Sequence, residues 1–344
     1  MNKQYENIIY IGRFQPFHNA HLATIKHAAS LAERVIVVIG SANQPRDIDN
    51  PFTEHERMMM IEASTQGLNV EFVCVENQMY NDTAWAVSVA KQVESLGVDS
   101  NSTRLIGHTK DESSFYLKIF PQWGEPIEMP LVEILDATTI RNLFFTESYN
   151  PNFLRNVTTA PVIDFLEKFK DTPEYLDILR EVEYITKYKK PYEGLPYPVS
   201  FNTGDAIVFK SGHVLMVKRR SHPGKGLLAF PGGFLNANTD RSLQDCGIRE
   251  LYEETGIKVP EAVIRGSIVE EKVFGAINRS RRGRIITTAQ IILLDDKDHP
   301  GLPKVKGSDD AEKAMWVPVH KVRRLDCFED HYDILQYARG RVGF

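Results

Sequence analysis

The sequence has few cysteines, no long apolar run and little excess charge, and each shortage excludes a class of protein. The three cysteines, Cys74, Cys246 and Cys327, are isolated, so neither a disulfide framework nor a cysteine-based zinc site is expected. No stretch approaches the about 18 apolar residues that predict a membrane-spanning helix. The N-terminus lacks the cationic segment and apolar core of a secretory signal. We therefore expect a cytoplasmic protein without a membrane partner.

The charge balance also limits the classes of ligand that the chain is expected to bind. A formal net charge of −5 at pH 7 argues against a broad nucleic-acid surface, since such surfaces are basic. A small anionic ligand needs only local positive charge, so binding of such a ligand remains possible. With 344 residues, of which 42% are hydrophobic, the chain suits two globular domains, each large enough to bury a core.

The first third of the chain alternates between strand and helix patterns. Apolar, β-branched runs at 7–11 and 35–39 predict buried strands, and residues 19–34 carry apolar side chains at helical spacing. Strand, helix and strand form a βαβ unit with parallel strands and a right-handed crossover. Further apolar runs at 71–75 and 104–106 extend the alternation. The predicted fold is an α/β doubly wound parallel sheet with ligands at the carboxyl ends of its strands.

The turn after the first predicted strand reads GRFQPFHNAH and places His18 and His21 at a helix start. Free backbone N–H groups at a helix N-terminus attract anions, so two histidines there favour a polyphosphate ligand. The residues before the pair that we expect to line the same pocket are Gly12, Arg13, Phe14 and Gln15.

Two later stretches predict further contacts to phosphate. Lys110 and Asp111 follow a strand end, on the ligand side of such a sheet, where Lys110 could contact phosphate and Asp111 could orient it or a ribose. Thr138 and Thr139 bring hydroxyl groups to a helix N-terminus, with Arg141 one turn inside. Hydroxyl and backbone donors together with a guanidinium form a second anion site.

The segment GRFQPFHNAH resembles the HxGH signature of the nucleotidyltransferase superfamily, with Ala20 in place of the Gly. Its GRFQPFHxxH form is similar to archaeal-type nicotinamide mononucleotide adenylyltransferases, and residues 138–141 resemble that family's late S/T-T-x-x-R motif. The resemblance implies a Rossmann-like fold and transfer of an adenylyl group from ATP to nicotinamide mononucleotide, giving NAD and pyrophosphate. It also implies that His21 stabilises the α-phosphate in the transition state.

The same resemblance implies roles for two other regions. The loop that contains Arg46 would border the nucleotide pocket, and Trp85, close to Asn81, would stack on the nicotinamide ring. Burial of Trp85 in the core is an equally good alternative. A different adenylyl acceptor, such as pantetheine phosphate, also stays open, although the Trp85 region argues mildly against it.

In the second half of the chain, residues 231–257 predict a metal site. They run from a Pro-Gly-Gly turn into a helix that stops at Gly256 and carries Glu250, Glu253 and Glu254 at positions i, i+3 and i+4. These carboxylates lie on one helix face and repel one another, which favours a bound cation over an ordinary acidic helix end. Mg²⁺, or Mn²⁺, prefers such oxygen ligands and leaves positions open for phosphate.

The segment RELYEETGI, residues 249–257, resembles the second half of the Nudix box, which implies Mg²⁺-dependent hydrolysis. In that family the arginine, here Arg249, pairs with a glutamate, and Thr239 stands at that position when the spacing is counted from Gly233. Either Asp240 or a two-residue loop insertion could compensate. The resemblance implies that Arg249 and the three carboxylates are catalytic, and that Gly232 and Gly233 line the substrate site.

A basic segment follows the predicted metal helix, with Arg282 and Arg284 among its arginines. Beside an acidic metal site it suits a diphosphate, and the alternative is an exposed loop with solvated charges. The segment resembles Nudix hydrolases that act on ADP-ribose, which implies AMP and ribose 5-phosphate as products. Strand-like runs at 263–269, 285–294 and 315–317 predict an antiparallel and mixed sheet flanked by helices, α+β in class.

Together the two resemblances imply a bifunctional enzyme with a nucleotidyltransferase domain at 1–170, a helical connector at 171–200 and a Nudix domain at 201–344. Its expected ligands are ATP, nicotinamide mononucleotide, NAD and ADP-ribose, without nucleic acid; a homo-oligomer stays open. An alternative keeps the first activity and makes the second domain a sensor that binds ADP-ribose without hydrolysing it.

Overall fold

The computed structural model describes residues 3–109, 112–130, 136–146, 151–295, 300–307 and 310–343. The chain divides into two compact units, Met1–Leu179 and Arg180–Phe344. The division falls inside helix α7 (Pro173–Lys189), and the domain bounds given above remain predictions. No helix among the described residues is both long and apolar enough to cross a membrane.

The first unit is built on a parallel sheet. The strands, in their order across the sheet, are β3 (Val70–Cys74), β2 (Ala32–Ile39), β1 (Tyr5–Gly12), β4 (Thr103–Gly107) and β5 (Ile127–Glu128). All four neighbouring pairs run parallel, so the predicted doubly wound sheet is confirmed. The carboxyl ends of β1 and β2 meet, because Gly12 pairs with Ile39.

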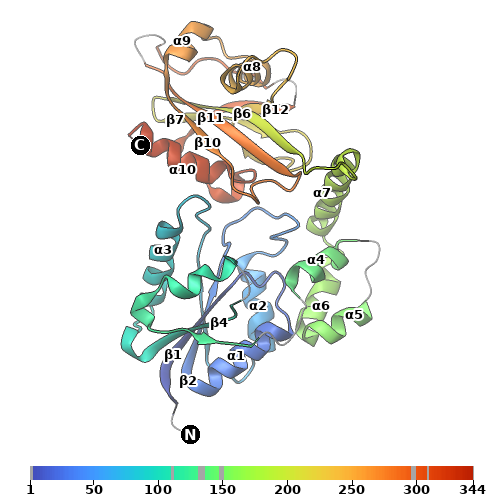
Figure 1. Ribbon diagram of the computed structural model, residues 1–344, viewed down its shortest axis with the longest axis vertical. Helices are drawn as coiled ribbons and strands as arrows, with labels where there is room; N and C mark the ends of the chain where they lie inside the picture. Colours follow the sequence, from blue (N-terminus) through green and yellow to red (C-terminus); the bar gives the residue numbers. More distant parts are fainter. Residues whose placement is uncertain are drawn as a thin grey trace. The chain divides into compact units, whose positions relative to one another are not determined.

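Helices flank this sheet. They are α1 (Asn19–Leu31), α2 (Glu54–Ser64), α3 (Asp82–Glu94), α4 (Ala137–Phe144), α5 (Pro151–Val157) and α6 (Ala160–Phe169). Val89 and Val93 of α3 pack with Ile9 and Ile36 in one buried cluster, while α1 and α2 lie on the other side of the sheet (Figure 1). The helix predicted for 19–34 is shorter, because β2 begins at Ala32, which pairs with Tyr5.

Within the described residues, the second unit contains a mixed sheet of seven strands in the order β10-β11-β6-β7-β12, with β8 paired to β7 and β9 to β6. Their bounds are β6 (Ser200–Lys210), β7 (His213–Arg219), β8 (Leu228–Ala229), β9 (Gly232–Phe234), β10 (Ile268–Phe274), β11 (Arg284–Leu293) and β12 (Ala311–Pro318). β6 and β11 are parallel, and the other pairs are antiparallel. The predicted mixed sheet is confirmed.

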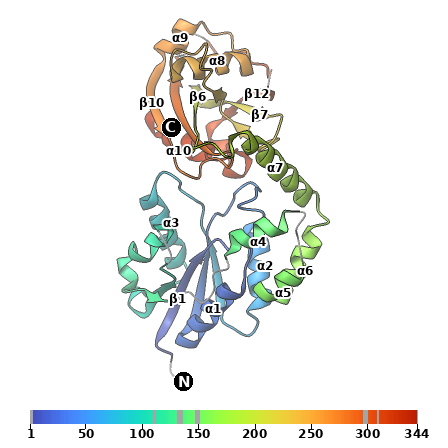
Figure 2. The same cartoon turned by 45° about the vertical axis from the view of Figure 1, so that its right-hand side comes forward.

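Helix α8 (Leu243–Thr255) covers one face of this sheet and α10 (His331–Arg341) lies on the other, as Figures 1 and 2 show. Ile248 and Leu251 of α8 pack on Ala206 and Val208 of β6. Short 3-10 helices span Ser100–Ser102, Glu112–Lys118, Pro121–Trp123, Lys190–Tyr192, Val319–Lys321 and Arg324–Asp326.

The strand predicted for 263–269 is wrong in its first half. Residues Glu261–Gly266 form helix α9, and β10 begins only at Ile268. The apolar run cannot distinguish a strand from a short buried helix turn, but Glu261 in the first turn favours a helix start.

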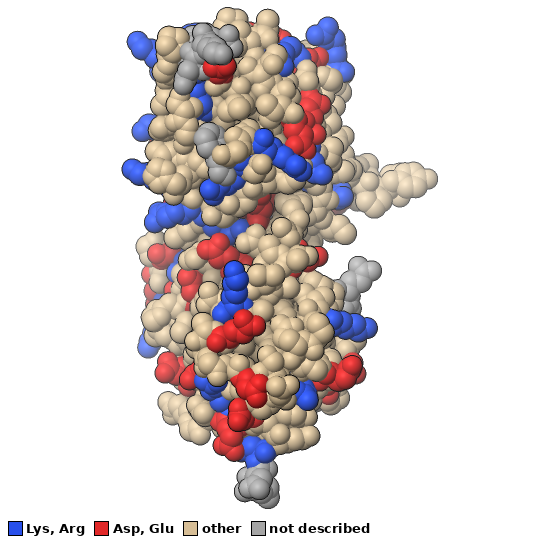
Figure 3. All heavy atoms as spheres, turned by 90° about the vertical axis from the view of Figure 1, so that its left-hand side faces the viewer, with Lys and Arg blue, Asp and Glu red and all other residues tan. Residues whose placement is uncertain are grey.

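Charged side chains of both signs are interspersed over the face drawn in Figure 3. On that face no single sign covers a broad area, in keeping with the formal net charge of −5 for the whole chain.

Candidate functional site

In the first unit, His18 and His21 come together at the start of α1. His18 is the N-cap residue, and the two imidazole rings stack with their centroids 3.5 Å apart. The backbone N–H of His18 donates to Nδ1 of His21 at 3.3 Å. Nδ1 of His21 therefore accepts, and the proton of the neutral ring lies on Nε2.

The charge state of His21 follows from its surroundings. Removal from water lowers the pKa of His21 well below its ordinary value, and the nearby His18 and His108 lower it further. The ring is thus neutral at physiological pH, with Nε2–H as a hydrogen-bond donor. A neutral donor of this kind can bind a phosphate oxygen without first losing or gaining a proton.

The residues before the histidines mostly shape the turn. A Cβ on Gly12 would lie 2.8 Å from the ring of Phe14, which is buried and has a φ of 53°. The Gln15 amide is also buried and bonds both backbone groups of Phe52, at 2.8 Å and 3.0 Å. Arg13 alone of these four predicted lining residues has an exposed side chain.

Arg141 ties α4 to this turn. Its Nη1 donates to the carbonyl of Gln15 at 2.8 Å, and its Nη2 donates to Asp49 and to the Thr138 hydroxyl, at 3.2 Å and 3.1 Å. Its buried Nε has no hydrogen-bond partner among the described residues. Burial lowers the pKa of Arg141 to about 10, and the nearby Arg13 contributes. Two guanidinium groups this close favour an anion beside them.

Arg57, which lies in α2, is a positioning residue beside the same turn. It is fully buried and donates to the carbonyls of Arg13, Gly40 and Ser41, at 2.7 Å, 2.6 Å and 3.0 Å. These carbonyls follow β1 and β2, so one side chain holds both strand ends.

Helix-cap contacts and an ion pair engage three of the other predicted residues. Thr139 donates its backbone N–H and its hydroxyl to Asp136, at 2.8 Å and 3.1 Å. Arg46 forms two hydrogen bonds with Glu56, at 2.7 Å and 2.9 Å. Asn81 caps α3 by accepting from the backbone N–H of residue 84 at 2.9 Å.

Trp85 packs on the rings of Phe115 and Phe120, beside the core. The structure therefore ties Arg46, Asn81 and Trp85 into protein contacts, and their roles at the substrate stay predictions. Lys110 and Asp111 lie outside the described residues.

In the second unit, Arg249 organises the predicted metal helix. Its Nε and Nη2 donate to the two carboxylate oxygens of Asp240, at 2.9 Å and 2.8 Å. Its Nη1 donates to Glu250 and to Glu253, both at 2.8 Å. Asp240 therefore pairs with the arginine where Thr239 offers no charge. The pair holds the pKa of Asp240 at about 2.

Glu254 and Glu250 face strand β9. Glu254 accepts a hydrogen bond from the backbone N–H of Gly232 at 3.1 Å. A Cβ on Gly233 would lie 2.4 Å from Oε1 of Glu250, and a Cβ on Gly232 would lie 2.0 Å from Oδ1 of Asp205. Only glycine leaves room for these carboxylates, so the Gly-Gly pair and the helix form one site.

The electrostatics of Glu254 fit a cation. Burial raises the pKa of Glu254 to about 8, against the lowering effect of the Gly232 N–H, and Glu250 raises it further. A divalent ion would offset this repulsion, and the all-oxygen donors suit Mg²⁺ or Mn²⁺. Among the described residues no three acidic, imidazole or thiol groups converge on one point, since Arg249 lies between Glu250 and Glu253. The ligand set Glu250, Glu253 and Glu254 stays a prediction.

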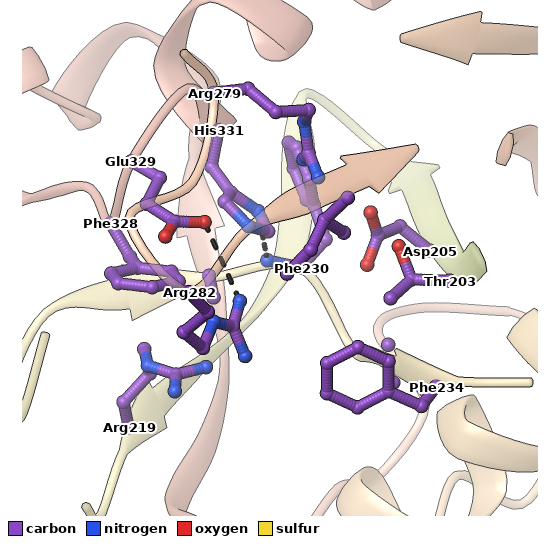
Figure 4. Close-up of a pocket in the computed structure, with 14 residues that line it drawn as sticks. Thr203, Asp205, Arg219, Phe230, Phe234, Arg279, Arg282, Phe328, Glu329 and His331 are labelled. Atoms are coloured by element: carbon purple, nitrogen blue, oxygen red, sulfur yellow. Dashed lines mark hydrogen bonds and ion pairs between the residues drawn. The ribbon is translucent and has the colours of Figure 1, made fainter. Parts of the chain in front are cut away.

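A hollow of about 410 Å³, its solvent-open part included, adjoins this site (Figure 4). Its charged and aromatic lining residues are Asp205, Arg219, Phe230, Phe234, Arg279, Arg282, Phe328, Glu329 and His331. Arg282, predicted from the sequence, lines it. Arg284 does not, because its guanidinium donates to the carbonyls of Gly275 and Ala276, at 2.7 Å and 3.1 Å.

Most of the lining residues were not predicted from the sequence. Arg219 lies at the end of β7 with its guanidinium 4.1 Å from the centre of the Phe328 ring. His331 accepts from the Phe230 backbone N–H at 3.0 Å through Nδ1, and burial lowers the pKa of His331 well below its ordinary value. These residues come from separate segments without motif spacing, so only the fold brings them together.

Comparisons with known proteins cover both units. Residues 9–110 match the cytidylyltransferase-like family, and residues 202–338 match the NUDIX domain. In sequence, the chain is 37% identical over 175 residues to the nicotinamide/nicotinic acid mononucleotide adenylyltransferase of Acinetobacter baylyi, an alignment that covers 50% of this chain and 90% of that protein.

In structure, the chain is similar to a bifunctional NMN (nicotinamide mononucleotide) adenylyltransferase/ADP-ribose pyrophosphatase from Francisella tularensis. The TM-score is 0.86 at 33% identity, over 97% of this chain and 98% of that chain. A second structure of such a protein from that organism, complexed with AMP and a manganese ion, matches with a TM-score of 0.85 at 32% identity, over 97% and 98% of the two chains.

Proposed function

The chain belongs to the family of bifunctional NMN adenylyltransferase/ADP-ribose pyrophosphatases, and we propose that its two units catalyse the two reactions of that name. The first unit would join nicotinamide mononucleotide to the adenylyl group of ATP, and the second would hydrolyse ADP-ribose. One observation carries the proposal, namely that each unit has its own site. The first unit has a pair of stacked histidines at a helix start, and the second has a helix with carboxylates beside a hollow lined by arginines.

For the first reaction, an oxygen of the 5′-phosphate of nicotinamide mononucleotide attacks the α-phosphorus of ATP. The bond from that phosphorus to the oxygen bridging the α- and β-phosphorus breaks, and pyrophosphate leaves. Such a displacement needs alignment and charge neutralisation more than covalent help. We assign Nε2–H of His21 to the α-phosphate, because the ring is neutral and its other nitrogen is already bonded to His18.

Positive charge for the triphosphate would come from Arg13 and Arg141. Arg13 has an exposed side chain, and Arg141 is held against the Gln15 carbonyl, so the two arginines flank the histidine turn. The nearby Arg13 lowers the pKa of Arg141, and an anion beside the two guanidinium groups would offset their repulsion.

For the second reaction, the oxygen of a water molecule attacks one phosphorus of the diphosphate, and the bond to the bridging oxygen breaks. The products are AMP and ribose 5-phosphate. Arg219 and Arg282, which line the hollow, would neutralise the diphosphate and hold it beside Glu254. Phe234 also lines the hollow (Figure 4), with the centre of its ring 5.5 Å from the guanidinium carbon of Arg282, and would add an aromatic contact to the nucleotide.

We propose Mg²⁺ or Mn²⁺ as the cofactor of the hydrolase, held by Glu250, Glu253 and Glu254. A bound divalent ion lowers the pKa of a coordinated water and neutralises phosphate charge. The support from this chain is the all-oxygen donor set, the backbone space beside Gly232 and Gly233, and the repulsion between Glu250 and Glu254. Arg249 would hold Glu250 and Glu253 in place.

Two assays of the purified chain test the proposal. One measures NAD formation from ATP and nicotinamide mononucleotide, with pantetheine phosphate as the competing acceptor. The other measures AMP release from ADP-ribose with Mg²⁺ or Mn²⁺. We expect both reactions. Tight binding of ADP-ribose without AMP release would instead identify a sensor, and faster adenylylation of pantetheine phosphate would overturn the nicotinamide assignment.

A further inference from the structure

Glu329 is an unusual residue for the hollow of the second unit. Arg219 and Arg282 make this hollow attractive to phosphate, and a carboxylate beside these guanidinium groups weakens that attraction. The other carboxylate that lines the hollow, Asp205, is bonded to the Thr287 hydroxyl at 2.6 Å. Diphosphate binding alone therefore gives no reason for Glu329.

The backbone at Glu329 is strained. Its φ is 44°, in the left-handed region that a glutamate rarely adopts. The neighbours on both sides fix this conformation. Phe328 is buried against Arg219, and Asp330 is fully buried and pairs with Arg279 through two hydrogen bonds of 2.9 Å. A strained residue held by its neighbours at a ligand pocket is a candidate for a functional role.

The carboxylate of Glu329 has acceptor capacity to spare. The side chain is 12% exposed, and Figure 4 shows it directed toward Arg282, whose Nη2 lies 3.5 Å from Oε2. Among the described residues no donor makes a hydrogen bond to Oε2. Burial raises the pKa of Glu329, against the lowering effects of Arg282 and Ser280. A buried acceptor without a donor costs free energy, which a ligand donor would recover.

We propose that Oε2 of Glu329 accepts hydrogen bonds from hydroxyl groups of a ribose attached to the diphosphate, and so selects ribose-bearing substrates. The proposal rests on the proposed hydrolysis of ADP-ribose. Phosphate oxygens at neutral pH only accept, whereas ribose hydroxyls donate. The position of the carboxylate favours a ribose over the adenine ring. Oε2 of Glu329 lies 3.5 Å from the Arg282 guanidinium, which would bind the diphosphate, and the sugars are attached directly to that diphosphate.

The test compares the wild-type protein with Glu329→Gln, which keeps the size of the side chain and removes its charge. Glu261→Gln is the control, because Glu261 is an exposed residue of α9 and does not line the hollow. The values of kcat/KM are measured for ADP-ribose, for the analogues that lack the 2′-hydroxyl of the adenosine ribose or the 2-hydroxyl of the terminal ribose, and for the inosine analogue. Melting temperatures check the fold of each variant.

We expect the wild-type protein to prefer ADP-ribose over one deoxy analogue by about tenfold or more, and Glu329→Gln to lose most of that preference. The deoxy analogue concerned identifies the ribose. An equal loss for all substrates would assign Glu329 to holding Arg282 and overturn the proposal, as would an unchanged preference or a loss that follows the adenine amino group.

If the wild-type protein released no AMP from ADP-ribose, the proposed function would fail. The inference about Glu329 would then be decided separately by calorimetric Kd values for the same four ligands. Loss of the ribose preference in Glu329→Gln binding would support the inference, and an unchanged preference would overturn it.

Discussion

Asp240 and Arg249 form a two-pronged ion pair, with Nε and Nη2 of the arginine 2.9 Å and 2.8 Å from the two carboxylate oxygens. The Asp240 side chain is 3% exposed. The same arginine bonds Glu250 and Glu253. Asp240 therefore positions these two carboxylates indirectly, by holding the arginine.

Replacement of Asp240 by Asn should destabilise the fold in a pH-dependent way. The pKa of Asp240 is about 2 in the folded chain and 3.8 ordinarily. A carboxylate whose pKa is lowered by folding stabilises the fold at every pH above its ordinary pKa. That stabilisation is lost as the pH falls from about 4 to about 2. We expect Asp240→Asn to lower the free energy of unfolding by about 1–2 kcal/mol at neutral pH. This figure is smaller than the pKa shift alone would give, because solvent screens the partly exposed arginine.

Urea unfolding over this pH range measures the difference. The gap between the two proteins should close as the pH falls, because the wild-type carboxylate becomes protonated. A gap that stays constant from about pH 7 to about pH 2 would contradict the assignment. A fall in AMP release is expected as well, since Arg249 loses its anchor.

Replacement of Gly233 by Ala should impair hydrolysis more than folding. The new Cβ would lie 2.4 Å from Oε1 of Glu250, and the flexible carboxylate would have to move. We expect AMP release to fall about tenfold or more, at a stability cost of about 1 kcal/mol. Gly266→Ala is the matched control, because a Cβ there meets no atom within 4 Å. Equal activities of the two variants would contradict the role of the Gly-Gly backbone.

Adenylyl transfer should show no ionisation of His21 near neutral pH. Because the pKa of His21 is lowered well below 6.5, the ring stays neutral across the range from about pH 6 to about pH 8. The kcat/KM profile should therefore show no step near pH 6.5 that is absent from His21→Ala, since the substrate phosphate, which ionises in the same range, does so with both proteins. His21→Ala should lower kcat by about 10²–10³, whereas His27→Ala, at an exposed position on the same helix, should not. A change in kcat/KM near pH 6.5, in either direction, that disappears in His21→Ala would show that the ring ionises there and would contradict this account.

Replacement of Arg141 by Lys should damage the first activity alone. A lysine cannot bond Gln15, Asp49 and Thr138 together, as the guanidinium does. We expect a stability loss of about 2 kcal/mol and a large fall in NAD formation, with AMP release unchanged. Arg155→Lys, an exposed position on α5, is the control. An undiminished rate of NAD formation would remove Arg141 from the site.

Local sequence patterns predicted what depends on local chemistry. The apolar runs predicted β1, β2 and the parallel sheet, and the carboxylate spacing placed Glu250, Glu253 and Glu254 on α8. The same reasoning failed at 263–269, where an apolar run served α9 as well as β10. Periodicity alone cannot separate the two over so few residues.

Tertiary contacts decided what the sequence left open. The choice between Asp240 and a loop insertion depended on which carboxylate reaches Arg249. Gln15 bonds Phe52 and Arg46 bonds Glu56, and the substrate contacts expected of these two residues stay predictions. Such pairings join residues that are separated in the chain, so no local sequence pattern predicts them.

The most direct test of the account measures both reactions in two variants, His21→Ala and Glu254→Gln. His21 and Glu254 belong to different units, so each variant should lose one reaction and keep the other. We predict that His21→Ala releases AMP from ADP-ribose at the wild-type rate but forms almost no NAD, and that Glu254→Gln does the reverse. Loss of both reactions in either folded variant, or full AMP release by Glu254→Gln, would contradict the account.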